Sequence, residues 1–354
     1  MLHDSLDLLP ALKAFPTADL DMHVTSLDRL PRLGARLGIE LFVKRDDTLQ
    51  LGMGGNKVRQ LEYYLGPGVL EGADTVLITG AVQSNFVRLC AAAACKLGWQ
   101  AVVQLEHRVP RDDEIYKNSG NVLLNQLYGA EIHYFAEGED ESAADAALDR
   151  MANGLRARGR RPYVVHLGIA HPPIGGLGYA RCAAECYAQF EAKGVMPDHV
   201  VIASGSGLTH AGFLVGARAV GWDVKIHGIC VRREASQQTQ RITRRATELD
   251  RMLGADRIRP HDIIVDDSVL APGYGQMNAQ VMEAITFAAQ DEGLLTDPVY
   301  TGRTMAGLIS LVNSGKIEQG SSVVFIHTGG LPAIFAYQRD IVSGLDNQQL
   351  KGGA

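Results

Sequence analysis

Short apolar runs alternate with amphipathic segments through most of the chain. Seven apolar runs are expected to form strands, at residues 41–43, 75–79, 101–105, 132–135, 200–203, 224–229 and 323–326. Apolar residues at helical spacing predict helices from residue 57 onward and at residues 85–97, 121–128, 143–158, 179–193 and 211–220. Because such alternation is typical of parallel sheets covered by helices, the sequence predicts an α/β fold.

A proline- and glycine-rich segment at residues 172–178 interrupts this alternation. A long predicted helix follows it and leads into further strands, so the segment is expected to be a crossing between domains. The chain has 354 residues, which is enough for two domains of ordinary size. Residues up to about 36 contain three prolines and little periodicity, and they are expected to form a surface arm with a short helix.

Composition narrows the possible partners. The chain carries 34 basic and 40 acidic residues, a net charge of −6, which disfavours binding to nucleic acid or to an anionic membrane. The first residues lack a basic region followed by an apolar core, so a cytoplasmic protein is expected. The five cysteines have no paired CxxC spacing. They are expected to be buried thiols rather than ligands, and no metal is predicted.

One lysine stands at a distinctive position. Gly54-Gly55-Asn56-Lys57 follows the first predicted strand and opens a helix. An ammonium group at the positive end of a helix dipole loses its proton more easily than a free lysine, which suits Schiff-base chemistry. A solvated surface lysine is the alternative.

Two loops after predicted strands are candidate anion sites. Gly80-Ala81-Val82-Gln83-Ser84-Asn85 opens a helix that Ser84 can cap. The loop at residues 204–210, Ser-Gly-Ser-Gly-Leu-Thr-His, concentrates glycine and hydroxyl groups before another helix. It lacks the third glycine of a dinucleotide fingerprint and the Lys-Ser/Thr ending of a nucleotide P-loop, so a single phosphate fits it better. A plain helix cap and a tight turn that binds nothing are the alternatives.

Further loops bring candidate side chains to the same edge of a sheet. Tyr274 and Tyr300 are flanked by glycine or proline, and His327-Thr328-Gly329-Gly330 follows the last clear strand. Phenols in such loops can transfer protons in a cleft if their pKa is lowered, although most tyrosines are packing residues.

In this order, the motifs resemble the pyridoxal-phosphate enzymes of the tryptophan-synthase-β fold group. Within that group they are similar to the branch of D-cysteine desulfhydrase, L-cysteate sulfo-lyase and 1-aminocyclopropane-1-carboxylate deaminase. The resemblance covers about residues 25–340 and also includes Asp297-Pro298-Val299-Tyr300. It implies two open twisted parallel-sheet domains with flanking helices: a larger cofactor-binding domain from residues 1–60 and 179–354, and a smaller one from residues 61–178. The active site would lie in the cleft between them.

The resemblance also implies a role for each motif. Lys57 would form a Schiff base with pyridoxal 5′-phosphate, Asn85 would contact its 3′ oxygen, and Thr301 and Thr328 would lie at its ring. The residues that would hold the cofactor phosphate are Gly205, Ser206, Gly207, Leu208 and Thr209. Those that would contact the substrate are Gln83, Ser84, Asn85 and Phe86. The candidates for catalysis are Lys57, Ser84, Tyr274 and Tyr300.

The implied activity is β-elimination from a cysteine-like amino acid, of the D-cysteine or L-cysteate type, to pyruvate, ammonia and sulfide or sulfite. Cyclopropane deaminases have glutamate at the position of Thr301 and leucine at that of Thr328. Since a hydroxyl at the ring nitrogen gives a weaker electron sink than a carboxylate, elimination is favoured over ring opening. A deaminase or β-replacement enzyme, a catalytically weak cofactor-binding protein and a simple anion-binding module remain alternatives. The family habit suggests a homodimer acting on a small amino acid.

Three positions depart from the desulfhydrase pattern. Phe86 replaces a common histidine, Ile169-Ala170 replaces glycine and serine, and Gln60 replaces a lysine that faces the phosphate. The first two are expected to alter the pocket near the substrate. The segments 106–110 and 118–121 look closer to the cysteate lyases and are expected to lie away from the chemistry.

Overall fold

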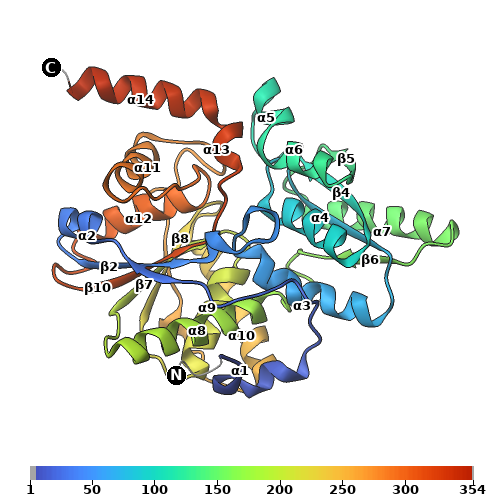
Figure 1. Cartoon of the computed structure of the whole chain (residues 1–354), viewed down its shortest axis with the longest axis horizontal. Helices are drawn as coiled ribbons and strands as arrows, with labels where there is room; N and C mark the ends of the chain where they lie inside the picture. The colour runs from blue at the N-terminus through green and yellow to red at the C-terminus, as the bar shows by residue number, and fades with distance from the viewer. Residues whose placement is uncertain (1–4, 353–354) are drawn as a thin grey trace.

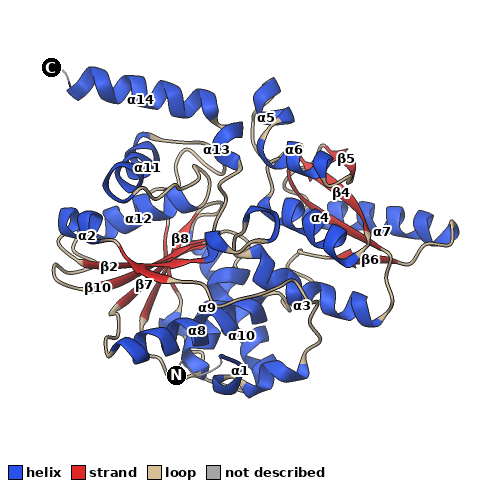
Figure 2. Cartoon of the chain, in the orientation of Figure 1, coloured by secondary structure: helices blue, strands red, loops and turns tan. Residues whose placement is uncertain are grey.

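A computed structural model describes residues 5–352, and within this range the chain forms two parallel sheets (Figures 1 and 2). The strands are β1 (Leu27–Arg29), β2 (Glu40–Arg45), β3 (Thr75–Ala81), β4 (Gln100–Glu106), β5 (Glu131–Phe135), β6 (Pro162–Val165), β7 (His199–Ser204), β8 (Lys225–Cys230), β9 (Ile264–Asp266) and β10 (Ser322–His327). The larger sheet has the order β1-β2-β10-β7-β8-β9 and the smaller one β5-β4-β3-β6. Every pairing is parallel except that of β1 with β2.

Helices cover both sheets. The α-helices are α1 (Ser5–Leu8), α2 (Pro31–Leu37), α3 (Lys57–Leu70), α4 (Asn85–Leu97), α5 (Glu114–Asn118), α6 (Gly120–Leu127), α7 (Glu141–Ala157), α8 (Gly176–Lys193), α9 (Leu208–Ala219), α10 (Ala235–Leu253), α11 (Ala279–Glu292), α12 (Thr301–Asn313), α13 (Ala333–Ala336) and α14 (Gln338–Gly352). Short 3-10 helices are η1 (Pro10–Ala14), η2 (Asp46–Thr48), η3 (Leu51–Met53) and η4 (Pro260–Asp262).

The predicted α/β class is confirmed, and each of the seven predicted strands is present. The sequence reading missed β1, β6 and β9, which have three or four residues each and only partial burial. Such short runs carry too little apolar pattern to stand out. The smaller sheet is built from strands within residues 75–165, and the larger one from strands within residues 27–45 and 199–327.

The inner strands β3, β7 and β10 are buried along their whole length. Helices therefore pack on both faces of each sheet. Close packing of α8 on α9 depends on glycine: a Cβ at Gly212 would lie 2.2 Å from the carbonyl oxygen of Gly176. This contact holds α9, and the loop before it, firmly against the core.

Helix α3 lies between the two sheets (Figure 1) and is fixed there by a network of buried ion pairs. Arg59 donates to Asp46 at 2.8 Å and to Glu185 at 2.9 Å, and Lys44 contacts Glu185 at 2.5 Å. The Arg59 and Lys44 side chains are 1% and 0% exposed. Because buried charges need partners, the first turn of α3 and its Lys57 are held in one position.

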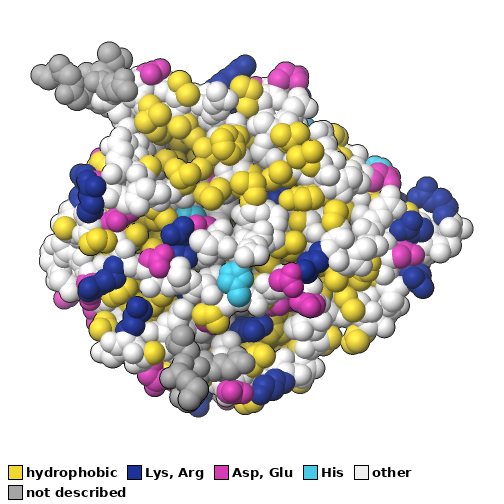
Figure 3. Space-filling view, in the orientation of Figure 1, with side chains coloured by type: hydrophobic (Ala, Val, Ile, Leu, Met, Phe, Trp, Pro, Cys, Tyr) yellow, Lys and Arg dark blue, Asp and Glu magenta, His cyan; other side chains and the backbone are white. Residues whose placement is uncertain are grey.

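Figure 3 shows hydrophobic side chains gathered on the visible face over α6, α11 and α13. Exposed apolar residues on the neighbouring helices α6, α13 and α14 include Leu127, Phe335 and Val342, at 71%, 63% and 49% exposure. Among the described residues, no helix combines the length and apolar character that crossing a membrane requires.

Candidate active site

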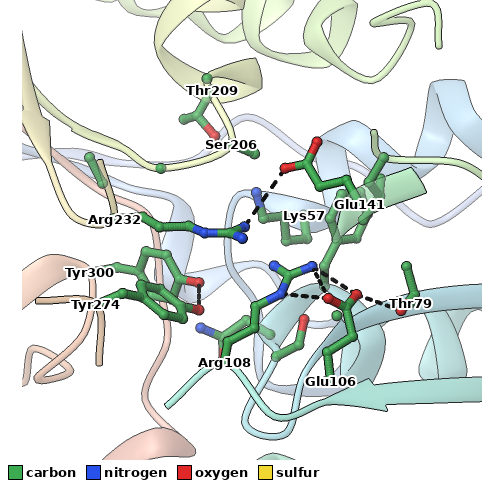
Figure 4. A pocket seen from close by; sticks show the side chains of 18 of the residues that line it. Lys57, Thr79, Glu106, Arg108, Glu141, Ser206, Thr209, Arg232, Tyr274 and Tyr300 are labelled. Carbon is green, nitrogen blue, oxygen red and sulfur yellow. Dashed lines mark hydrogen bonds and ion pairs between the residues drawn. The ribbon is translucent and has the colours of Figure 1, made fainter. Parts of the chain in front are cut away.

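A cavity lies between the two sheets, where loops leave the carboxyl ends of their strands (Figure 4). The smaller sheet contributes the loop after β3, the end of β4 and the start of α7. The larger sheet contributes the loops after β7, β8 and β10. This position is where open α/β sheets bind ligands.

Lys57, the first residue of α3, lines this cavity. Burial lowers the pKa of its amine from 10.5 to about 7. Its Nζ atom donates to Gln60 Oε1 at 3.2 Å and lies 4.9 Å from the centre of the Phe86 ring. A neutral, nucleophilic amine is therefore available near neutral pH, as Schiff-base chemistry requires.

The N-terminus of α4 also opens into the cavity through Ser84, Asn85 and Phe86. Ser84 caps the helix, since its hydroxyl accepts a hydrogen bond from the Val87 N–H at 3.2 Å, as predicted. The first turn leaves the N–H groups of Asn85 and Phe86 without partners in the helix. Together with the helix dipole, they make this end of the cavity suitable for a carboxylate.

Two hydrogen bonds hold the side chain of Asn85 in one orientation. Its amide oxygen accepts from Asn121 at 3.0 Å and from Arg88 at 3.4 Å. This fixes which side of the amide carries the N–H donors, so a donor is available to an oxygen in the cavity.

Gln83 is not among the residues that line the cavity. Its amide donates to the carbonyl oxygen of Tyr116 and accepts from the Asn121 N–H at 2.8 Å. It therefore positions Asn121, and through it Asn85, rather than contacting the cavity.

The loop before α9 presents Gly205, Ser206, Gly207 and Thr209 to the cavity. Gly207 has a φ of 91°, which strongly favours glycine. The Thr209 hydroxyl accepts from Asn56 at 2.8 Å and from Gln60 at 2.9 Å, which leaves its own proton to donate elsewhere. Leu208 is buried in the core, so only its backbone can serve a ligand.

Two arginines that the sequence reading missed hold the outer side of this loop. Arg233 donates to the carbonyl oxygen of Gly205 at 3.2 Å, and Arg241 donates to that of Ser206 at 2.8 Å. Both also contact Glu141, at 2.8 and 3.3 Å. By tying the carbonyl groups down, they favour a loop whose N–H groups face the cavity.

Tyr274 and Tyr300 lie together at the cavity wall, with their hydroxyl oxygens 2.6 Å apart (Figure 4). Burial, together with Tyr274, raises the pKa of Tyr300 well above its ordinary value. At Tyr300 the structure therefore does not supply the lowered pKa that proton abstraction by a phenol requires. The pair can donate and relay a proton, but Tyr300 is not poised as an ionised base.

Glu106 and Arg108 line the cavity, so the expectation that segment 106–110 lies away from the chemistry was wrong. Arg108 forms two 2.8 Å hydrogen bonds to Glu106, which also accepts from Thr79 at 2.6 Å (Figure 4). None of residues 118–121 lines the cavity, although Asn121 donates a hydrogen bond to Asn85, which does.

Thr328 lines the cavity, but Thr301 does not. The Thr301 hydroxyl is fully buried and donates to Asp297 at 2.8 Å while accepting from the Asp297 N–H. Thr301 thus secures the start of α12 behind Tyr300. Of the two hydroxyls expected at the cofactor ring, Thr328 alone is at the cavity surface.

At the cavity wall, Asp145 lies 3.1 Å from His171 and 3.5 Å from His166. The two imidazole rings are stacked 4.1 Å apart at an interplanar angle of 7°. Because imidazole donates its lone pairs in the ring plane, stacked rings cannot both point at one ion. We therefore assign no metal to this group.

Comparison with known proteins agrees with this geometry. Residues 19–329 match the family model described as pyridoxal-phosphate dependent enzyme. The chain belongs to the pyridoxal-phosphate-dependent enzyme family.

It is 39% identical over 336 residues to a D-cysteine desulfhydrase of Serratia proteamaculans, covering 95% of this chain and all of the relative. It is 41% identical to a D-cysteine desulfhydrase of Salmonella choleraesuis, covering 92% and 97%. A solved structure described as an ACC deaminase homologue superposes with a TM-score of 0.84 at 34% identity, covering 97% of this chain and all of that one. The fold is the tryptophan-synthase-β-like fold type II.

The residues of the cavity fit the family cofactor. Lys57 supplies an amine of lowered pKa, and the Gly205–Thr209 loop, at the N-terminus of a 12-residue helix, would hold the phosphate. Gln60, at a position where the resemblance would call for a phosphate-facing lysine, instead forms hydrogen bonds with both Thr209 and Lys57. The aldehyde and the phosphate of pyridoxal phosphate would therefore each have a partner.

Proposed function

We propose that the protein is a β-eliminating lyase that converts a cysteine-like amino acid to pyruvate, ammonia and the released sulfur group. The observation that carries this proposal is the pKa of about 7 of Lys57 in a cavity that also holds a phosphate loop and a helix N-terminus. The identity to D-cysteine desulfhydrases supports the reaction type.

Bound pyridoxal phosphate would supply an electron sink for the Cα carbanion. The N–H groups at the start of α4 would bind the substrate carboxylate, and Asn85 would orient the cofactor through its fixed amide. Lys57, once displaced from the cofactor, would take or return the Cα proton. Loss of that proton and cleavage of the Cβ–S bond, with the electron pair leaving on sulfur, gives 2-aminoacrylate, which hydrolyses to pyruvate and ammonia.

The paired phenols of Tyr274 and Tyr300 would act as proton donors rather than as the base. The hydrogen bond between Tyr274 and Tyr300 lets one hydroxyl donate while the other replaces its proton. Since the pKa of Tyr300 is raised, we assign the pair to protonation of the leaving group or of the product carbon rather than to proton abstraction. Ser84 lies at the substrate end of α4, where its hydroxyl can contact the carboxylate or Cα.

A second candidate is a 1-aminocyclopropane-1-carboxylate deaminase, which the similarity to the ACC deaminase homologue favours. Release of keto acids from purified protein separates the two. We expect pyruvate from D-cysteine or L-cysteate, abolished by Lys57→Ala. Release of 2-oxobutanoate from the cyclopropane amino acid as the fastest reaction would overturn the lyase proposal, and no turnover of any amino acid would leave a cofactor-binding protein.

We also propose that two copies associate through the neighbouring helices α6, α13 and α14, which expose Leu127, Phe335 and Val342. Their exposure of 49–71% is costly for a lone chain in water. Sedimentation should show a dimer that Phe335→Glu weakens. A wild-type monomer at micromolar concentration would contradict this.

A further inference from the structure

Besides the exposed Arg244, four arginines of the described residues border the mouth of the cavity: Arg108, Arg232, Arg233 and Arg241. Three have clear structural tasks. Arg108 is bound in two places by Glu106, and Arg233 and Arg241 hold the carbonyl groups of the Gly205–Ser206 turn. Arg232 has no such task.

Arg232 lines the cavity and its side chain is only 8% exposed. Among the described residues its buried Nε atom has no hydrogen-bond partner. Its short ion pair, at 2.8 Å, is with Glu139, which is 73% exposed, and Glu141 lies at 3.9 Å. Figure 4 shows its guanidinium group directed into the cavity, where a dashed line marks the ion pair with Glu141.

Positive charge around Arg232 is only partly balanced. Glu141 is shared by Arg232, Arg233 and Arg241, and Glu139 is open to solvent. Burial, with repulsion from Arg232 and Arg241, lowers the pKa of Arg233 to about 10. An unpaired donor on a largely buried cation is costly unless an anion occupies the space in front of it.

We propose that Arg232 determines specificity by binding a negatively charged group on the β-carbon of the substrate. The inference rests on the proposed β-elimination and narrows its substrate class to amino acids with an anionic β-substituent. A sulfonate, sulfate ester and phosphate ester share the required tetrahedral oxyanion. D-cysteine, whose thiol is neutral at neutral pH, would be the poorer substrate.

The cofactor phosphate is a competing partner for Arg232. The loop that would receive it already has N–H groups, the Thr209 hydroxyl and its own two arginines. Arg232 is thus left for a second anion. If Arg232 binds the cofactor phosphate, a substitution at residue 232 should lower the affinity for the cofactor. If it binds the substrate anion, the substitution should change the preference among substrates.

The test uses the cofactor-loaded enzyme and the variants Arg232→Gln, Arg232→Lys and Arg244→Gln. Arg244 is the matched control, because it borders the same mouth but is 52% exposed and paired with Glu248. The measurement is kcat/KM for L-cysteate, serine O-sulfate and phosphoserine, each divided by that for D-cysteine. We expect Arg232→Gln to lower the ratio for the preferred anion about 10- to 100-fold, mainly through KM, and Arg232→Lys to recover part of it.

Calorimetry with 3-sulfopropanoate gives a readout independent of turnover, because this molecule has both anionic groups but no amine. Its affinity, relative to that of propanoate, should fall by a similar factor in Arg232→Gln and not in Arg244→Gln. Equal losses in both variants, an unchanged ratio, or a loss confined to cofactor affinity would overturn the proposal. If the wild type turns over no amino acid, the proposed function fails, and calorimetry still decides the anion site.

Discussion

Replacing Gln60 by glutamate should raise the pKa of Lys57 strongly. Gln60 is fully buried and its Oε1 atom lies 3.2 Å from Lys57 Nζ. Unit charges at that distance attract by roughly 5 kcal/mol at an effective dielectric constant of about 20. The cost of burying the new carboxylate offsets part of this, so we expect a net gain for the protonated amine of about 3 kcal/mol, or about two pKa units.

The assay is the rate at which cofactor-free protein captures pyridoxal phosphate, followed by visible absorption across a pH series. Only the neutral amine attacks the aldehyde, so the rate follows the neutral fraction of Lys57. With a pKa of about 7 in the wild type, roughly three quarters of the amine is neutral at pH 7.5. With a pKa of about 9 the neutral fraction is roughly 3%.

The midpoint of the rate against pH is the decisive quantity. The new carboxylate also repels the cofactor phosphate, but this slows capture at every pH without moving the midpoint. Gln60→Met is the control, and its midpoint should remain near that of the wild type. A midpoint that does not move in Gln60→Glu, or a wild-type midpoint near 10, would refute the assigned environment of Lys57.

Three further predictions concern the same cavity. Ser84→Ala should lose about 1 kcal/mol of stability with the cap of α4, and turnover should fall about a hundredfold or more, whereas Ser84→Thr keeps the cap; near wild-type turnover by Ser84→Ala would remove its catalytic role. Without cofactor, Lys57→Met should melt at a higher temperature than the wild type, because burial lowers the pKa of Lys57 from 10.5 to about 7 on folding. The loss of wild-type stability is full below pH 7 and fades as the pH approaches 10.5, so a difference in melting temperature that persists unchanged at pH 11 would contradict this. Because threonines occupy positions 301 and 328, where the resemblance to the cyclopropane deaminases would call for glutamate and leucine, 1-aminocyclopropane-1-carboxylate should yield little 2-oxobutanoate compared with pyruvate from cysteine-type substrates, and the ratio of the two products checks this.

The parts of the site that the sequence predicted are those set by local patterns. Lys57 opens α3, Ser84 caps α4, and the loop at residues 204–210 precedes α9, each because a strand, a glycine-containing turn and a helix follow one another in the chain. Parallel strands bring such loops to one edge of a sheet. Proximity of these motifs therefore followed from the fold class.

What the sequence could not show depends on contacts between distant segments. Arg232 follows β8 of the larger sheet, whereas Glu141 begins α7, which packs on the smaller sheet. Nothing in either local sequence indicates that the two residues are neighbours. Asn121 donates a hydrogen bond to Asn85, which is 36 positions earlier in the chain. Gln83 accepts a hydrogen bond from the Asn121 N–H instead of contacting the cavity. One signal was present for Glu106 and Arg108: Glu106 ends a buried strand and Arg108 follows it, as the other loops that reach the cavity follow strands.

Covalent mapping of the cofactor tests the central claim most directly. Borohydride reduction of the purified, cofactor-loaded protein followed by peptide mass spectrometry should place the pyridoxyl group on Lys57. Lys44 is the informative comparison, because it lies thirteen positions earlier but is fully buried against Glu185, Gln189 and the Thr25 carbonyl. Modification of Lys57 alone is the expected result, and modification of Lys44 or of no lysine would contradict the account.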